Sequence, residues 1–282
     1  MISRDPKVCL ITGATSGIGK AAAISLARQG FKLVLVGRAQ EKSEKVRQGI
    51  KEVLPNSTPE VYIGDLSSRQ SIGALAKDIR SAHPRIDVLI NNAGGIFGSR
   101  VLTAEGIEYT FALNHLGYFS LTNLLLDTLQ AAGDARIVNV GSQVHKFSKI
   151  DLGDLSSSGG YNAMKAYAQS KLANLLFTYE LSRRLAGTKI TVNALHPGGV
   201  RTNFGRELPG LAGIFFRHFG LFLRSPEKGA ETLIWLASSD QVAGVTGKYF
   251  LDKREIRSSN ISYDLALAKQ LWDVSSKLTA LD

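Results

Sequence analysis

Six short, continuously apolar runs alternate with longer helical patterns along this chain, and that alternation restricts the folds it can adopt. The apolar runs occupy residues 7–12, 32–37, 60–65, 87–92, 135–142 and 189–196. Helical patterns cover residues 17–30, 40–54, 68–82, 103–132 and 161–186, with a further helix after Pro226 and a candidate seventh strand at 248–251. Runs without polar alternation are typical of parallel strands covered by helices on both faces. The sequence therefore predicts an α/β fold: a single-domain, Rossmann-type doubly wound parallel sheet of about seven strands, spanning residues 1–282.

Composition narrows the classes of partner and compartment. The chain has 34 basic and 24 acidic residues, a formal net charge of +10. Such a charge can favour nucleic acid, anionic lipid or phosphorylated ligands, but the Lys and Arg residues are scattered and no nucleic-acid-binding motif accompanies them. Cys9 is the only cysteine, which fits a reducing compartment. Residues 1–13 lack the apolar segment of a signal peptide, and no apolar stretch is long enough to span a bilayer. We therefore expect a cytoplasmic protein that binds no nucleic acid.

The segment TGATSGIGK, residues 12–20, follows the first predicted strand and opens the first predicted helix. Its glycines Gly13, Gly17 and Gly19 have G-x3-G-x-G spacing rather than the G-x-G-x-x-G dinucleotide fingerprint. The physical reasons are the same, because glycine permits a tight turn and lets backbone N–H groups approach a pyrophosphate at a helix N-terminus. This turn predicts a dinucleotide site.

The end of the second strand indicates which nicotinamide cofactor is used. NAD-binding folds place an Asp or Glu there to hold the ribose 2′-hydroxyl. Here Gly37 is followed by Arg38, with no acid until Glu41, and a guanidinium suits a 2′-phosphate. NADP(H) is therefore favoured over NAD(H). The ends of the third and fourth strands add Asp65, Leu66 and the segment NNAG (91–94) as candidate adenosine and ribose contacts.

Six motifs, taken together and in order, resemble the short-chain dehydrogenase/reductase family over nearly the whole chain. They are TGATSGIG (12–19), NNAG (91–94), Asn114 in FALNHLG, Ser142 in IVNVGS, YAQSK (167–171) and HPGGVRT (196–202). The resemblance implies a catalytic tetrad of Asn114, Ser142, Tyr167 and Lys171. Strand ends and resemblance together give the expected cofactor contacts: Gly13, Thr15, Ser16, Gly17, Ile18, Gly19, Arg38, Asp65, Leu66, Asn92, Ala93, Gly94, Tyr167, Lys171, Pro197, Gly198, Val200 and Thr202.

The implied tetrad suits carbonyl reduction, which needs a hydride on carbon and a proton on the developing alkoxide. Tyr167 and Lys171, four residues apart, share one face of a helix. An ordinary Tyr has a pKa of ~10, and a nearby ammonium, with the positive charge of an oxidised nicotinamide, would favour tyrosinate. Tyr167 would exchange the proton, Ser142 would hydrogen-bond the substrate oxygen, and Asn114 would position a water in a relay behind Lys171.

A narrower resemblance concerns the substrate. Ser142 and Tyr167 stand 25 residues apart, and Tyr167 is followed by SKLANLLF (170–177). Both features look like the retinol-dehydrogenase-like branch, which is related to light-dependent protochlorophyllide reductase. The branch implies an NADPH-dependent oxidoreductase that reduces a lipophilic aldehyde or ketone and reversibly oxidises the alcohol. Two alternatives stay open: reduction of a tetrapyrrole carbon–carbon double bond, and a non-catalytic NADP-sensing protein.

The apolar segment 208–224 also suggests a lipophilic substrate. It follows HPGGVRT, where a substrate lid is expected around residues 203–225. The alternatives are peripheral membrane contact with basic residues toward headgroups, a homo-oligomer interface, or an ordinary core helix. Many retinol dehydrogenases carry an N-terminal membrane anchor that residues 1–13 do not show, which weakens retinol itself as the expected substrate. No metal site is expected, since His145, His196 and His218 lack the spacing of metal ligands.

Overall fold

One mixed sheet forms the centre of the computed structural model, which describes residues 6–200 and 223–281. Within those residues the sheet has eight strands in the order β3-β2-β1-β4-β5-β6-β7-β8. Strands β1 to β7 pair in parallel and β8 pairs antiparallel to β7. The predicted doubly wound parallel sheet is confirmed, with one short strand more than expected. The strands are β1 (Val8–Thr12), β2 (Lys32–Gly37), β3 (Glu60–Ile63), β4 (Val88–Asn91), β5 (Arg136–Val140), β6 (Thr191–Leu195), β7 (Lys248–Leu251) and β8 (Arg254–Glu255).

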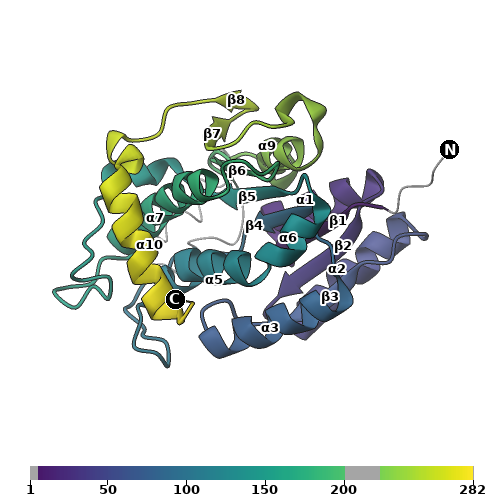
Figure 1. Cartoon of the computed structure of the whole chain (residues 1–282). Coiled ribbons are helices and arrows are strands. Elements are labelled where there is room, and N and C mark those ends of the chain that lie inside the picture. The colour runs from purple at the N-terminus through teal and green to yellow at the C-terminus, as the bar shows by residue number, and fades with distance from the viewer. Residues whose placement is uncertain (1–5, 201–222, 282) are drawn as a thin grey trace.

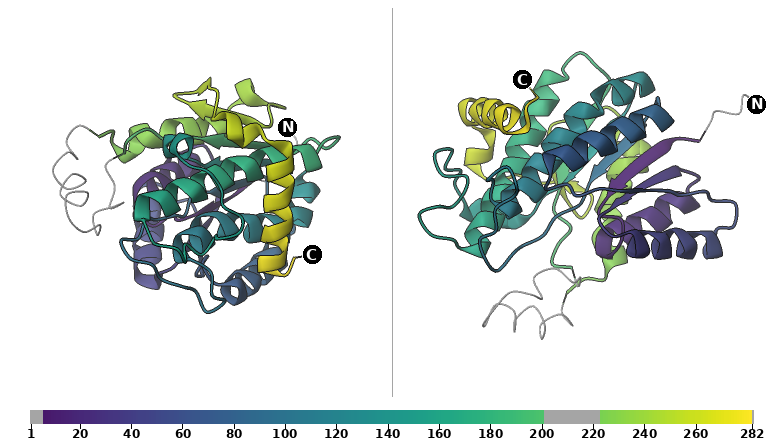
Figure 2. Two further views of the ribbon diagram at one scale, coloured as in Figure 1. Left: turned by 90° about the vertical axis from the view of Figure 1, so that its left-hand side faces the viewer. Right: turned by 90° about the horizontal axis from the view of Figure 1, so that it is seen from below.

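Helices cover both faces of this sheet (Figures 1 and 2). Alternate residues of β1 explain the continuous apolar runs, because Leu10 packs into the core beneath α3, α5 and α7 while Cys9 and Ile11 pack beneath α1, α2 and α9. One face carries α1 (Gly17–Arg28), α2 (Gln40–Val53) and α9 (Pro226–Ser238). The other carries α3 (Arg69–Ala82), α5 (Gly117–Leu124), α6 (Leu126–Ala132) and α7 (Ala163–Arg184).

The single helix predicted over residues 103–132 is wrong at its start and its continuity. The backbone turns between Thr103 and Gly106. The N–H of Gly106 donates to the carbonyl of Thr103 at 2.9 Å, and the φ of Gly106 is +76°. Helix α4 (Tyr109–Phe111) begins only after Glu108, whose carboxylate accepts from the Thr110 and Phe111 N–H groups. A π-helical turn, η1 (Ala112–Leu116), then leads into α5. The apolar pattern is continuous through the π turn, so it gives no sign of this break.

The C-terminal helix α10 (Leu265–Thr279) lies across α7 and α5, as the yellow helix in Figure 2 shows. Trp272 anchors it, with ring centroids 4.9 Å from Phe119 and 5.9 Å from Phe177. The Arg184 guanidinium stacks 4.0 Å from the Trp272 ring centroid. Part of the surface of α5 and α7 is therefore covered by the chain's own helix.

Some predictions fall outside the described residues or stay untested. Residues 201–222 are outside the described part of the chain. They include Thr202, the predicted lid at 203–225 up to residue 222, and most of the apolar segment 208–224. The single-domain assignment and the homo-oligomer stay predictions. In the part of the chain that is described, no helix is long and apolar enough to cross a membrane.

Candidate active site

A cavity of about 680 Å³ opens at the carboxyl ends of the strands. It lies where the strand order reverses between β1 and β4, the point at which doubly wound folds bind their ligands. Of the predicted site residues, Gly19 and Asn114 do not line the cavity, and Thr202 is not described. Those that do are Gly13, Thr15, Ser16, Gly17, Ile18, Arg38, Asp65, Leu66, Asn92, Ala93, Gly94, Ser142, Tyr167, Lys171, Pro197, Gly198 and Val200.

The glycine turn after β1 has a conformation that lets a ligand approach its backbone closely. Gly13 and Gly17 have φ of +65° and +53°, which favour glycine. Gly19 has a different reason: a Cβ there would lie 2.4 Å from the Gly13 carbonyl oxygen. Helix α1 starts at Gly17, the side chain of its N-cap residue Ser16 makes no capping bond, and its first turn holds no acid. The free N–H groups and the helix dipole therefore suit a phosphate, so the turn fits a dinucleotide.

The loop after β4 is tied to that turn by hydrogen bonds that the sequence analysis missed. Thr12 Oγ1 accepts from the backbone N–H groups of Asn92 at 2.9 Å and Ala93 at 3.1 Å. The Asn92 amide donates to the carbonyls of Thr12 at 2.9 Å and Gly13 at 3.1 Å. Asn92 therefore joins two loops, and Thr12, buried at the end of β1, is part of the site's frame.

Arg38 lies at the far end of the cavity, where β2 ends. Its Nη1 donates to the hydroxyl of Tyr109, 71 residues away in sequence, at 2.7 Å. Tyr109 is held in turn by Phe97, with an edge-on ring contact at 4.7 Å between centroids. The guanidinium therefore has a fixed partner that still leaves donors for an anion.

Tyr167 and Lys171 both lie on the buried side of α7, 9% and 3% exposed. Lys171 Nζ donates to the Val140 carbonyl at 2.9 Å and lies 5.6 Å from the Tyr167 ring centroid. Burial raises the pKa of Tyr167, and hydrogen bonding with Ser142 only partly opposes it. Burial also lowers the pKa of Lys171 to about 7. Burial therefore disfavours the charged form of both side chains, so the two alone do not favour tyrosinate and Tyr167 keeps its proton at neutral pH.

Hydrogen bonds position the side chains of Ser142 and Asn114. Ser142 follows strand β5, and its Oγ accepts from the Val144 N–H at 3.5 Å. Asn114, in the π turn, donates to the Gly95 carbonyl at 2.9 Å and to Ser170 Oγ at 3.0 Å, and its Oδ1 accepts from Gly95 N–H at 2.8 Å. Its side chain thus clamps the loop after β4 against α7, just behind the cavity wall.

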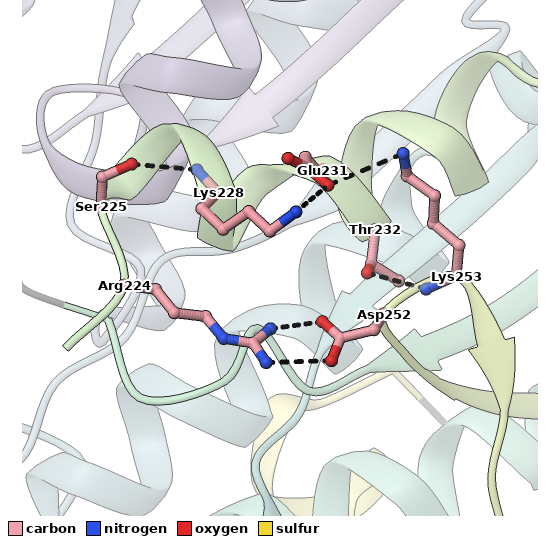
Figure 3. A network of polar contacts seen from close by, with 7 residues as sticks. All are labelled: Arg224, Ser225, Lys228, Glu231, Thr232, Asp252 and Lys253. Carbon is pink, nitrogen blue, oxygen red and sulfur yellow. Dashed lines mark hydrogen bonds and ion pairs between the residues drawn. The ribbon is translucent and has the colours of Figure 1, made fainter. Parts of the chain in front are cut away.

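The loop after β6 is fixed by a network that the sequence analysis also missed (Figure 3). Val200 pairs with Arg224, whose side chain lies against Gly198. Arg224 binds both carboxylate oxygens of Asp252, with Nη2 at 2.9 Å from Oδ2. Asp252 sits in the β7–β8 turn, next to Lys253. The ion pair therefore ties the cavity wall at Gly198 and Val200 to the sheet edge.

Substituting Lys171 with Met is expected to raise the free energy of unfolding at pH 7, by on the order of 3 kcal/mol. The unfolded chain holds the lysine proton up to pH ~10.5, whereas burial lowers the folded pKa to about 7. Between these values the unfolded chain binds more protons, so wild-type stability rises with pH and the advantage of the Lys171→Met variant shrinks. Urea unfolding at pH 7, 8.5 and 10 measures this. Lys165→Met, on an exposed position of α7, is the control. A Lys171→Met advantage that does not change with pH contradicts the prediction.

The histidines form no metal site among residues 6–200 and 223–281, where no group of three or more His, Cys, Asp or Glu side chains is suitably placed. His196 is mostly buried, and burial with the nearby Arg224 charge lowers its pKa to about 4. His145 is fully buried beside Ser142.

Comparisons with known proteins agree with this geometry. The family model "short chain dehydrogenase" matches residues 7–210. Human retinol dehydrogenase 14 is 41% identical, over 98% of this chain and 87% of that protein. Human polyprenol dehydrogenase is 38% identical, over 99% and 86%. A solved uncharacterized protein from Mycobacterium paratuberculosis has a TM-score of 0.78 at 33% identity, over 97% and 93% of the two chains. An Escherichia coli short chain dehydrogenase, solved with NADPH, has a TM-score of 0.69 at 27% identity, over 86% and 95%.

Proposed function

The chain belongs to the short-chain dehydrogenase family, in its retinol-dehydrogenase-like branch, and from this premise we propose that it is an NADPH-dependent reductase of lipophilic aldehydes or ketones. An oxidoreductase of alcohols and carbonyls that uses a nicotinamide cofactor follows from the family. The observation that carries the finer proposal is the pairing of a buried, protonated Tyr167 with Ser142 at one end of a cavity whose other end holds Arg38.

The cofactor choice is supported by the charge at the end of β2. Arg38 lines the cavity and is oriented by Tyr109, while Asp or Glu is absent from the segment between Gly37 and Gln40. A planar cation held in this way suits the 2′-phosphate of NADPH. The uncapped N-terminus of α1 would receive the pyrophosphate. The solved Escherichia coli relative with NADPH is consistent with this choice.

The reaction assigns one task to each polar residue. NADPH, when bound, supplies the hydride that adds to the carbonyl carbon. Ser142 would donate a hydrogen bond to the substrate oxygen, and Tyr167 would give that oxygen its proton. Lys171, with a pKa of about 7, would carry a proton toward Tyr167 near neutral pH. Asn114 holds Gly95 in place, so the predicted water behind Lys171 would rest on a fixed loop.

The substrate class is supported by the cavity wall around Tyr167. Ile96 and Val144 pack against the Tyr167 ring. Phe97, Met164 and Leu223 extend the apolar lining, and Leu223 belongs to the predicted lid segment. Such a wall would desolvate a long apolar chain while Ser142 and Tyr167 hold its single oxygen. The relatives named retinol and polyprenol dehydrogenases fit the same class.

Steady-state assays test the proposal. We expect turnover of medium-chain and polyene aldehydes with NADPH, and a clearly lower kcat/KM with NADH. A short polar aldehyde is the matched control and should react poorly, because it leaves the apolar wall uncovered. Equal use of NADH would contradict the cofactor assignment. NADPH binding without turnover across a broad panel of carbonyls would instead favour the non-catalytic alternative.

A further inference from the structure

His145 is a fully buried side chain next to the catalytic site whose two ring nitrogens both bind backbone groups. Its Nδ1 lies 2.6 Å from the carbonyl oxygen of Ser142. Its Nε2 lies 3.0 Å from the backbone N–H of Ser259, 114 residues further along the chain. One imidazole therefore joins the backbone of the predicted catalytic serine to the C-terminal part of the protein.

These two contacts determine where the ring proton lies. The Ser259 N–H is a donor, so Nε2 must accept and Nδ1 must carry the hydrogen that it gives to the Ser142 carbonyl. Burial lowers the pKa of His145, with the nearby Lys146 charge acting in the same direction, which keeps the ring in this neutral form. Both nitrogens are used, so the ring has no proton to exchange with a substrate.

The contact holds Ser142 by its backbone carbonyl and does not use its hydroxyl. The Ser142 carbonyl also accepts from the His145 backbone N–H at 3.3 Å. The side chain and the main chain of His145 therefore both donate to the Ser142 carbonyl oxygen. With the peptide fixed, the Ser142 hydroxyl is left to meet Tyr167, whose pKa it influences. A rotation of this peptide would turn the hydroxyl away from the substrate oxygen.

The Ser259 side of the bridge is itself firmly anchored. The hydroxyls of Ser258 and Tyr179 lie 2.7 Å apart, and Tyr179 belongs to α7, the helix that carries Tyr167. The Ile256 N–H donates to the Tyr249 carbonyl at 2.8 Å. The Tyr249 ring meets His145 edge-on, with centroids 5.4 Å apart. Ser259 lies beyond residues 7–210, the part matched by the family model.

We propose that His145 is a positioning residue, which fixes Ser142 for catalysis and makes the C-terminal segment around Ser259 part of the active-site frame. This inference rests on the proposed carbonyl reduction. It predicts that breaking the bridge at its far end, with every catalytic side chain intact, lowers kcat while cofactor binding is unchanged.

Ser259→Pro breaks the bridge at its Ser259 end. The φ of Ser259 is −67°, which is the value that proline imposes, but the variant loses the N–H that binds His145, and the proline Cδ takes the place of that hydrogen and displaces the imidazole Nε2. We expect kcat to fall about tenfold or more, with NADPH affinity unchanged in a fluorescence titration. Ser259→Ala keeps the N–H and should keep wild-type kcat. If Ser259→Pro keeps kcat within about twofold of Ser259→Ala, the proposal is overturned.

A second series changes the ring itself. His145→Leu removes both bonds, whereas His145→Asn places an amide donor where Nδ1 lies and should recover most of the kcat lost in His145→Leu. Equal kcat in these two variants contradicts the positioning role. A readout independent of turnover is the ¹⁵N NMR spectrum of His145 in the whole protein, where we expect a protonated Nδ1 and a bare Nε2. The opposite tautomer would contradict the inference even if no substrate is found, and so would Ser142 amide signals that Ser259→Pro does not shift. If both NMR results are as expected and no carbonyl is turned over, the result counts against the proposed function alone.

Discussion

Replacing Tyr167 with Phe is expected to lower kcat for carbonyl reduction by about 10²–10⁴-fold, because it removes the hydroxyl that would protonate the substrate oxygen. The aromatic ring, which packs with Ile96 and Val144, is retained, so the fold should not change. Burial keeps the wild-type hydroxyl protonated at neutral pH, which makes it a donor in the reducing direction. Steady-state kinetics with NADPH and a polyene aldehyde measure the loss, and a binding titration should show a much smaller change in NADPH affinity.

Tyr118→Phe provides the matched control. Tyr118 is also fully buried and its ring lies 5.7 Å from Lys171 Nζ, but its hydroxyl has no hydrogen-bond partner among the described residues. Removing that hydroxyl should leave kcat within about twofold of wild type. A Tyr167→Phe protein that keeps more than about a tenth of wild-type kcat would exclude Tyr167 as the proton donor.

The sheet and the cofactor turn were predictable because their signals are local. A strand with both faces buried must be apolar at every position, as Leu10 and Ile11 show by packing on opposite sides of the sheet. The glycines of the first turn are also a local signal, because Gly13 and Gly17 adopt the positive φ that favours glycine. The helix start at Tyr109 had a local signal too: Gly106 after Thr103, followed by the capping Glu108, marks a turn before a helix.

What could not be predicted depends on residues that meet only in the fold. Tyr109 binds Arg38 and Ser259 binds His145 across 71 and 114 residues, and no spacing rule connects such pairs. The same limit applies to electrostatics. From the sequence, Lys171 is a cation that lowers the pKa of Tyr167, whereas in the fold burial dominates the pKa of both groups.

Replacing Arg38 with Ser is expected to weaken NADPH binding about 10²-fold while changing NADH binding little. Two charge-assisted hydrogen bonds from the guanidinium to a 2′-phosphate would contribute about 3 kcal/mol together, which corresponds to that factor. NADH has no phosphate at this position, so it loses nothing. Equilibrium titration of both cofactors, and kcat/KM for each, measure the change in preference.

Two further variants separate the effect of the Arg38 guanidinium from the effects of its Tyr109 contact and of the protein's net charge. Tyr109→Phe removes the hydroxyl that Arg38 donates to at 2.7 Å, so Arg38 keeps its charge and loses one anchor. We expect NADPH affinity to fall only about threefold to tenfold, because the charge that binds the phosphate is kept and only one hydrogen bond that orients the guanidinium is lost. Arg28→Ser, on an exposed position at the end of α1, removes the same net charge away from the cavity and should leave NADPH affinity unchanged. If Arg38→Ser and Arg28→Ser weaken NADPH equally, the preference for NADPH comes from the overall positive charge of the protein and not from a phosphate site at Arg38.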